Sequence, residues 1–368
     1  MILALFLFLQ TNLFQQYSQA FPEMVRDGYV NCNTCHISLN GGGLLNDYGR
    51  AIIREELSIW KSSDEKSREQ DFLYGVLDDA PISKWLKLGA DVRSVYFYQN
   101  DEFHNSGQTI FMQGDFEAAA TFGRFTILGD SGVKQDPGKN AEYISRRHWI
   151  GYAITDEWNI RGGKFEPTYG INTPEHVTLT RDPLHLGQGN EGYNLELSRI
   201  TEQWSLFVSG LFGRPDDSKL KPIKDKGFAV QGSYSPTEKL KFGVNTLYGS
   251  TDLSKRWLLG GFAILGITHE LLFMTEMDYQ YKDTPVKGFA STQKLSYELI
   301  PGLWAFGVQE YGKFDFNNDL SQDQVYGVGL QAFPRAHFQF DFQYSKAKTP
   351  AYSAQFYDTA WLMSHVYF

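Results

Sequence analysis

The feature that most limits the fold of this chain is a two-residue alternation of apolar and polar side chains over most of its length. In residues 338–344 every even position is aromatic and every odd position is polar. The same period occurs in residues 111–122 and 271–281. Successive side chains of a β-strand point to opposite faces, so each run predicts a strand with one apolar and one polar face.

The chemistry of the two faces is typical of a strand that lies between lipid and water. The apolar positions are mainly Phe, Tyr, Leu and Val, whereas the polar positions carry charges that a dry core would not accommodate. Aromatic residues make up 15% of the chain, which suits a lipid-facing surface with interfacial girdles. A soluble sandwich would also alternate, but its apolar faces would meet in one core. We therefore predict an all-β fold, a transmembrane antiparallel β-barrel.

The alternating segments number about sixteen and have about 10 residues each, as bacterial outer-membrane barrels require. A barrel of this size has a wide lumen. The segments are 86–98, 108–121, 123–130, 144–155, 157–166, 190–200, 203–213, 226–235, 239–250, 255–266, 269–281, 287–299, 303–314, 323–332, 335–347 and 356–367. The charged residues predicted to face the lumen are Lys87, Asp91, Arg93, Asp115, Glu117, Glu196, Lys241, Glu276, Asp278, Lys294, Glu298 and Asp341.

The start of the chain predicts export. An apolar run at residues 2–9 leads to Ser18-Gln19-Ala20, a small-x-small cleavage pattern, so residues 1–20 are predicted to be a secretory signal peptide. The apolar run is much shorter than the roughly 20 residues of a membrane-spanning helix. The net charge of −9 argues against nucleic acid as a partner.

One short motif lies outside the strand pattern. Cys32-Asn33-Thr34-Cys35-His36 is a C-x-x-C-H run, the attachment signature of a c-type haem. The two thiols would add to the haem vinyl groups, and His36 would ligate the iron from one face. The alternatives are a disulfide or a thioredoxin-like dithiol, but the βαβ pattern of thioredoxin-like motifs is absent. A zinc site would need two further ligands at finger-like spacing, and none is visible nearby. We predict one covalently bound haem c.

Residues 21–80 are predicted to form a small α-helical monohaem cytochrome c segment, and residues 81–368 the porin-like barrel. Gly41-Gly42-Gly43 allows a tight bend near the macrocycle. Residues 44–60 have helical spacing, and Asn46 or Asp47 is predicted to cap the helix. A segment this small buries too little apolar area to be stable alone, which favours a plug inside the lumen over a separate head.

A six-coordinate haem needs a second ligand, usually Met or His. Residues 167–189 have no strand pattern, and loops of that length are usually functional. We favour His176 of this loop as the distal ligand, with Met24 and His185 as alternatives; otherwise the iron takes another residue or stays open. Arg181 and Arg50 are predicted to contact the haem propionates. No residue is predicted to be catalytic.

The order of these parts resembles the fused monohaem cytochrome c–porin family, which is similar to the outer-membrane iron-oxidising cytochromes. At residue level the resemblance lies in the C-x-x-C-H run and in Leu45-x-x-Tyr48-Gly49-Arg50, which looks like the family's Leu/Asn-x-aromatic-Gly-Arg stretch. The triple glycine and residues 37–40 depart from the pattern expected of iron oxidisers, so the resemblance supports a conduit better than it supports iron as the substrate.

The resemblance implies a location in the outer membrane of a Gram-negative cell and electron transfer through the single haem. The implied partners are a periplasmic c-type cytochrome, an extracellular metal ion or small redox donor, and outer-membrane lipid. An activity as an extracellular ferrous-iron oxidase is the enzymatic form of this prediction. The alternative is a passive outer-membrane porin with a structural or sensory haem plug.

Overall fold

The structure is a computed structural model that describes residues 22–60, 84–103, 105–135, 140–173, 175, 177–214, 225–251, 254–284 and 286–368. The predicted signal peptide, residues 61–80 of the predicted cytochrome segment, and His176 lie outside the described residues.

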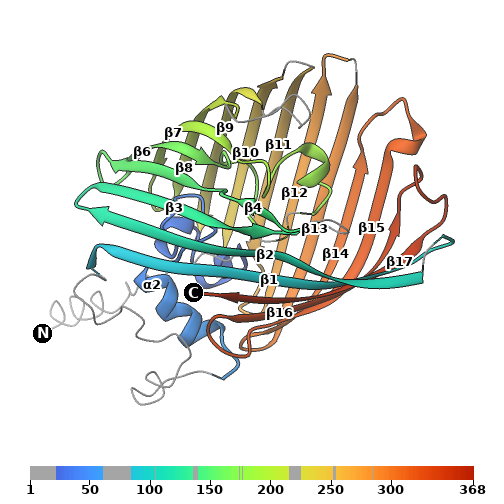
Figure 1. The fold of residues 1–368 in the computed structure, drawn as a ribbon, viewed down its shortest axis with the longest axis horizontal. Helices are drawn as coiled ribbons and strands as arrows, with labels where there is room; N and C mark the ends of the chain where they lie inside the picture. Colours follow the sequence, from blue (N-terminus) through green and yellow to red (C-terminus); the bar gives the residue numbers. More distant parts are fainter. Residues whose placement is uncertain are drawn as a thin grey trace, which may run out of the picture.

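One antiparallel sheet closes on itself to form a β-barrel (Figure 1). Strands that follow one another in sequence pair, except that β4 and β5 both pair with β3, and β1 also pairs with β17, which closes the barrel. The strands are β1 (Leu86–Asn100), β2 (Asn105–Phe122), β3 (Phe125–Lys134), β4 (Glu142–Ile144), β5 (His148–Ala153), β6 (Trp158–Phe165), β7 (Gly192–Ile200), β8 (Trp204–Phe212), β9 (Lys226–Thr237), β10 (Leu240–Ser250), β11 (Lys255–Gly266), β12 (Leu271–Lys282), β13 (Lys287–Ile300), β14 (Leu303–Lys313), β15 (Gln322–Ala332), β16 (Phe338–Lys348) and β17 (Tyr357–Tyr367).

The short strands β4 and β5 occupy one position in the barrel. Both pair with β3, with Ile144 opposite Gly132 and His148 opposite Gly129. Residues 145–147 interrupt the pairing between them. The barrel therefore has sixteen strand positions, and the predicted number is confirmed. Every predicted segment overlaps a strand, with boundaries that differ by a few residues.

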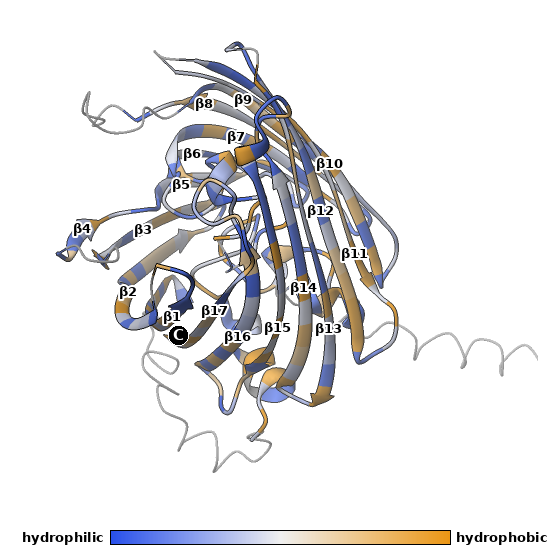
Figure 2. Ribbon diagram, turned by 90° about the vertical axis from the view of Figure 1, so that its right-hand side faces the viewer, coloured by the Kyte–Doolittle hydropathy of each residue, from blue (hydrophilic) through white to orange (hydrophobic). Residues whose placement is uncertain are grey.

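The two faces of the sheet follow the predicted alternation, which Figure 2 shows as bands of opposite hydropathy along the strands. In β16, Phe340 and Phe342 are exposed on the outside, whereas Gln339 and Asp341 are buried on the inside. The predicted lumen-facing residues that are buried are Arg93, Asp115, Glu117, Glu196, Glu276, Asp278, Lys294 and Asp341. The outer band of apolar side chains is typical of a barrel surrounded by lipid.

The two ends of the barrel differ in the length of their connections. At one end, here the short-turn end, strands are joined by few residues, as at Gly302 between β13 and β14. At the other, the long-loop end, residues 166–191 join β6 to β7. In bacterial barrels the short turns are periplasmic and the long loops are extracellular.

Residues 22–60, called the plug below, lie in the short-turn end of the barrel and at its mouth (blue in Figure 1). The plug contacts several turns of that end: Arg26 donates to the His269 carbonyl, and Asn31 donates to the Thr201 carbonyl. Farther along, the Ile59 N–H donates to the carbonyl of Phe333, which follows β15. Contacts on opposite sides of the ring place the plug across the lumen.

The plug contains little regular structure. Its elements are the 3₁₀ turns η1 (Pro22–Asp27) and η2 (Cys32–Thr34), the helix α2 (Asp47–Ile52) and the π turn η3 (Ile53–Leu57). The Asn46 side chain caps α2 by accepting from Gly49 N–H, as predicted. The predicted helix at 44–60 begins later because Leu44 and Leu45 pair with residues 36 and 37 in an extended conformation. The expected α-helical segment is therefore one short helix within residues 22–60. None of the helices in the described residues is both long and apolar enough to cross a membrane.

Residues 166–191, called the inner loop below, fold back into the lumen and cross to the opposite wall. Tyr169 donates to Asp278 of β12 at 2.8 Å, and Arg181 pairs with Glu276 of the same strand at 2.6 Å. The inner loop also carries a 3₁₀ turn, η5 (Asp182–Leu184). Its apolar residues pack in a cluster made of Tyr169, Leu184, Leu186, Leu211, Ala229, Leu247, Leu258 and Ala290. The lumen is thus occupied by the plug from one end and by the inner loop from the middle.

Candidate functional site

The C-x-x-C-H run forms a tight turn that brings its chemical groups together. The N–H groups of Cys35 and His36 donate to the Cys32 carbonyl at 3.3 and 3.1 Å. Cys35 is buried, Cys32 is half-buried, and the two sulfur atoms are not joined in a disulfide. Cys32 and His36 line a cavity between the plug and the barrel wall. The turn therefore presents Cys32 and His36 to the cavity, while Cys35 is buried behind them and does not line it.

The His36 ring is oriented by the backbone of the triple glycine. Its Nδ1 lies 3.2 Å from the Gly43 carbonyl oxygen, which can accept only if Nδ1 carries the proton. The lone pair is then on Nε2. Histidines that ligate metals usually hold their other ring nitrogen in this way, which fixes the tautomer. This contact fits the prediction that His36 is an axial ligand.

The three glycines form the predicted tight bend. Gly41, Gly42 and Gly43 have φ values of 83°, 75° and 66°, all in the left-handed region that favours glycine. A Cβ on Gly41 would lie 3.1 Å from the Cys32 Cβ, and a Cβ on Gly43 would overlap the Arg147 guanidinium. The bend therefore keeps side chains out of a space beside Cys32.

We expect Gly43→Ala to destabilise the protein more than Gly123→Ala does. Both glycines have a left-handed backbone, but only the new methyl group at Gly43 would overlap another side chain. The new methyl group would push the Arg147 guanidinium out of its ion pairs with the buried Glu117 and Asp130, so the overlap is not relieved freely, and overpacking of this kind costs about 1–3 kcal/mol. Gly123→Ala is the matched control, because φ is 60° there and no atom lies within 4 Å of the new Cβ. Urea unfolding midpoints in detergent measure the difference. Equal losses in the two variants would contradict the steric role of Gly43.

Helix α2 packs directly against the motif. A Cβ on Gly49 would overlap the Cys35 carbonyl, so only glycine allows this approach. The next residue, Arg50, donates to the Leu88 carbonyl of β1, and its side chain does not line the cavity. The predicted propionate contact of Arg50 is therefore not supported by its position.

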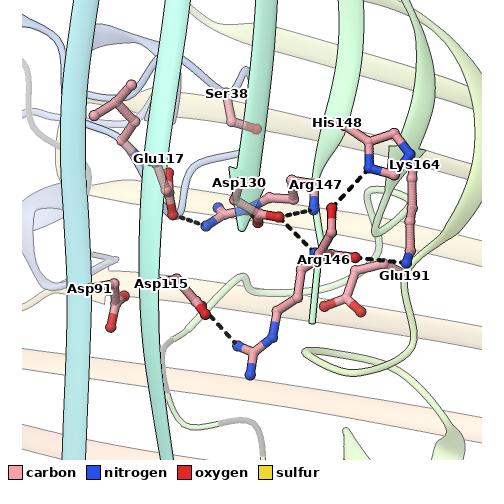
Figure 3. A network of polar contacts seen from close by, with 12 residues as sticks. Ser38, Asp91, Asp115, Glu117, Asp130, Arg146, Arg147, His148, Lys164 and Glu191 are labelled. Atoms are coloured by element: carbon pink, nitrogen blue, oxygen red, sulfur yellow. Dashed lines mark hydrogen bonds and ion pairs between the residues drawn. The ribbon is translucent and has the colours of Figure 1, made fainter. Parts of the chain in front are cut away.

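Five arginines line the cavity: Arg93, Arg146, Arg147, Arg161 and Arg181. Figure 3 shows Arg147 directed at Glu117 and Arg146 directed at Asp115, with 3.7 Å between the charged atoms of the latter pair. Of the five, Arg181 was predicted as a propionate contact and Arg93 as a lumen-facing charge, whereas the other three were not predicted. The missed signal was the pair Arg146-Arg147 inside a predicted strand. Adjacent side chains of a strand point to opposite faces, so one of these two charges would have faced lipid if the strand were regular there.

Arg161 of β6 connects the wall to the plug. It is 2% exposed, pairs with Glu196 at 2.6 Å, and donates to Ser38 at 3.0 Å and Asn40 at 3.2 Å. The inner loop reaches the same stretch of the plug, where Asn172 donates to the Asn40 carbonyl. Residues 38–40 are thus held between the wall and the inner loop.

The predicted distal ligands lie in different places. Met24 is buried in an apolar cluster with Leu45 and Ile52 and does not line the cavity. His185 is exposed at the end of η5 and does not line the cavity either. Among the described histidines, the ones that line the cavity are His36 and His365. His365 was missed, although its odd position in β17 is on the face opposite the lipid-facing even positions.

One tyrosine of the plug adds a polar group to the mostly apolar side of the cavity. Tyr29 is buried, lines the cavity, and its hydroxyl lies 3.4 Å from that of Tyr48. Burial, and then the Tyr48 hydroxyl, raise the pKa of Tyr29, so it stays protonated at neutral pH.

In the described part of the chain, no group of three or more His, Cys, Asp and Glu side chains is arranged to hold a metal ion.

Known proteins match this chain by structure and not by sequence. No protein-family model and no curated protein sequence matches it. The solved outer-membrane channel DcaP of Acinetobacter baumannii aligns with a TM-score of 0.58 at 12% identity, covering 77% of this chain and 97% of that one. OprB of Pseudomonas putida aligns with a TM-score of 0.57 at 10% identity, covering 77% and 94%. OmpT of Vibrio cholerae aligns with a TM-score of 0.56 at 9% identity, covering 77% and 99%.

These similarities concern the fold. They confirm the prediction of a porin-like β-barrel, the architecture shared by these outer-membrane proteins. At identities of 9 to 12%, they transfer no residue role to this chain.

Proposed function

We propose that this chain is an outer-membrane electron-transfer protein whose plug carries one haem c. The observation that carries the proposal is the C-x-x-C-H turn in a lumen cavity, with the His36 Nδ1 held by the Gly43 carbonyl. The surroundings fit a haem: glycines leave space beside Cys32, apolar side chains such as Phe262 and Ile264 line one part, and arginines line another.

Each group of residues has a separate task in this proposal. Cys32 and Cys35 anchor the haem covalently, and His36 ligates its iron. Arg147 and Arg181 offer positive charge to the propionates, although each is already paired with a carboxylate. The bound haem supplies one-electron exchange, and the protein tunes its potential through ligation, burial and hydrogen bonding.

The barrel determines where such a protein works. Its lipid-facing exterior and porin-like fold support a location in the outer membrane, with the plug on the periplasmic side. A periplasmic c-type cytochrome would then approach the short-turn end. An extracellular donor, such as ferrous iron or a small redox molecule, would approach the long-loop end. The hydrocarbon layer between these partners is about 30 Å thick, so the haem needs a position inside the barrel.

A passive porin with a structural or sensory haem plug is the second candidate. The fold favours it, because the similar solved structures include an outer-membrane channel. The occupied lumen disfavours free diffusion, because the plug and the inner loop make contact at Asn40 and Asn172. The two functions differ in redox behaviour and in ion conductance.

Absorption spectra and bilayer recordings on the purified full chain separate the two candidates. We expect anaerobic ferrous iron or a small donor to reduce the haem, and oxidised periplasmic cytochrome c to reoxidise it. We also expect planar-bilayer conductance well below that of an open sixteen-stranded porin. A haem that only dithionite reduces, together with open-porin conductance, would favour the passive porin.

A further inference from the structure

We infer that His365, on the barrel wall, is the second axial ligand of the haem iron. The inference rests on the proposed function and adds a residue to its site. His365 belongs to β17 and is buried on the inner face, where it lines the same cavity as His36. Among the described residues, no other histidine lines that cavity.

The His365 ring is held in the same manner as the His36 ring. Its Nδ1 lies 2.9 Å from the Gln339 Oε1, while the Gln339 amide nitrogen donates to Asp341. Because the amide oxygen only accepts, Nδ1 carries the proton and donates to it. In the neutral ring the lone pair is then on Nε2, the nitrogen that a metal would take.

The opposite side of the ring faces a carboxylate that already has other partners. His365 Nε2 lies 3.2 Å from the Asp91 Oδ1. Asp91 also accepts two hydrogen bonds from Arg93, at 3.0 and 2.9 Å, and one from Gln113 at 2.8 Å. A protonated ring would donate to Asp91 from Nε2, whereas a neutral ring with its proton on Nδ1 directs a lone pair at this anion. To ligate iron, Nε2 would exchange its contact with Asp91 for the metal, and Asp91 would retain Arg93 and Gln113 as hydrogen-bond donors.

The plug approaches this part of the wall. A Cβ on Gly89 of β1 would meet both the Leu44 side chain and the Phe368 carbonyl, so these two groups lie side by side at this point of the wall. Leu44 follows the glycine bend that holds His36, and Phe368 lies three residues after His365. The two rings are thus carried by segments that meet at the β1–β17 seam, one on the plug and one on the wall.

Spectra of the ferric protein test this assignment. We expect wild type to be low-spin with the electron paramagnetic resonance signature of two histidine ligands. His365→Ala should become mainly high-spin, and added imidazole should restore the low-spin form. His365→Met should stay six-coordinate and gain the methionine-to-iron absorption band. His185→Ala, on an exposed loop position outside the cavity, is the matched control and should match wild type.

The outcomes keep this inference separate from the proposed function. A wild-type spectrum typical of His–Met ligation, or an unchanged low-spin spectrum in His365→Ala, overturns the role of His365 and leaves the haem in place. A polypeptide without covalent haem overturns the proposed function itself. Resistance to dodecyl sulfate unfolding on gels confirms that each variant forms the barrel. If His365→Ala does not fold, the wild-type spectrum and His365→Met still decide the ligand.

Discussion

Replacing Cys32 and Cys35 together by alanine is expected to abolish covalent haem attachment completely. The two thiols are the only cysteines in the sequence, so no other side chain can form a thioether to the haem. Intact-mass spectrometry of protein from cells competent in cytochrome maturation should show one haem per wild-type chain and none in the double variant. The haem-stained band on a denaturing gel should fall to background.

A single change within the motif provides the control for this experiment. Asn33→Ala keeps both thiols, their spacing and His36, so it should retain haem at the wild-type level. The double variant should still form the barrel, because the paired strands that close it do not include the motif. An unmodified wild-type polypeptide would contradict the prediction and remove the basis of the proposed function.

Arg161→Ala is expected to destabilise the protein by about 3–5 kcal/mol, as is typical when one partner of a buried ion pair is removed. The substitution leaves the fully buried Glu196 without its cation, and it removes the hydrogen bonds to Ser38 and Asn40 of the plug. Two readouts apply: the denaturant midpoint of the barrel, and the rate at which protease cleaves the plug. Both should change, because Arg161 contributes to both parts.

Arg199→Ala is the matched control for Arg161. Arg199 pairs with Glu157 at 3.0 Å, but both side chains are about half exposed, and such pairs contribute about 0–1 kcal/mol. The double variant Arg161→Met/Glu196→Gln should recover much of the stability lost in Arg161→Ala, because no buried charge remains unpaired. Similar losses for Arg161→Ala and Arg199→Ala would contradict the role assigned to the buried pair.

The barrel could be predicted from the sequence because a strand with one face in lipid and one in water has apolar and polar residues at alternate positions. The interruption between β4 and β5 could not be predicted, because it arises from a contact with a neighbouring strand. Asp130 of β3 accepts hydrogen bonds from the N–H groups of Arg146 and Arg147, at 2.7 and 2.9 Å. These bonds replace the sheet ladder locally, and a sequence pattern does not reveal which acceptor a backbone N–H will find.

Only those parts of the site that are formed by residues close together in sequence could be predicted. The turn at Cys32 and the bend at Gly41-Gly42-Gly43 follow from residues that are adjacent in sequence. The inner loop was recognised by its missing strand pattern, but its inward path depends on carboxylates more than 80 residues away, such as Glu276 and Asp278. His365 lies more than 300 residues from the motif, so its place beside the cavity emerges only when β17 closes against β1.

The burial of Cys35 under Gly49, inside a closed ring of strands, constrains the biogenesis of this protein. An enzyme that attaches haem must reach both sulfur atoms. Pairing of β1 with β17 around the amino-terminal segment would block its access. For a chain that carries haem, cofactor loading in the periplasm therefore precedes insertion. The barrel of such a chain would then close around a plug that already carries its haem.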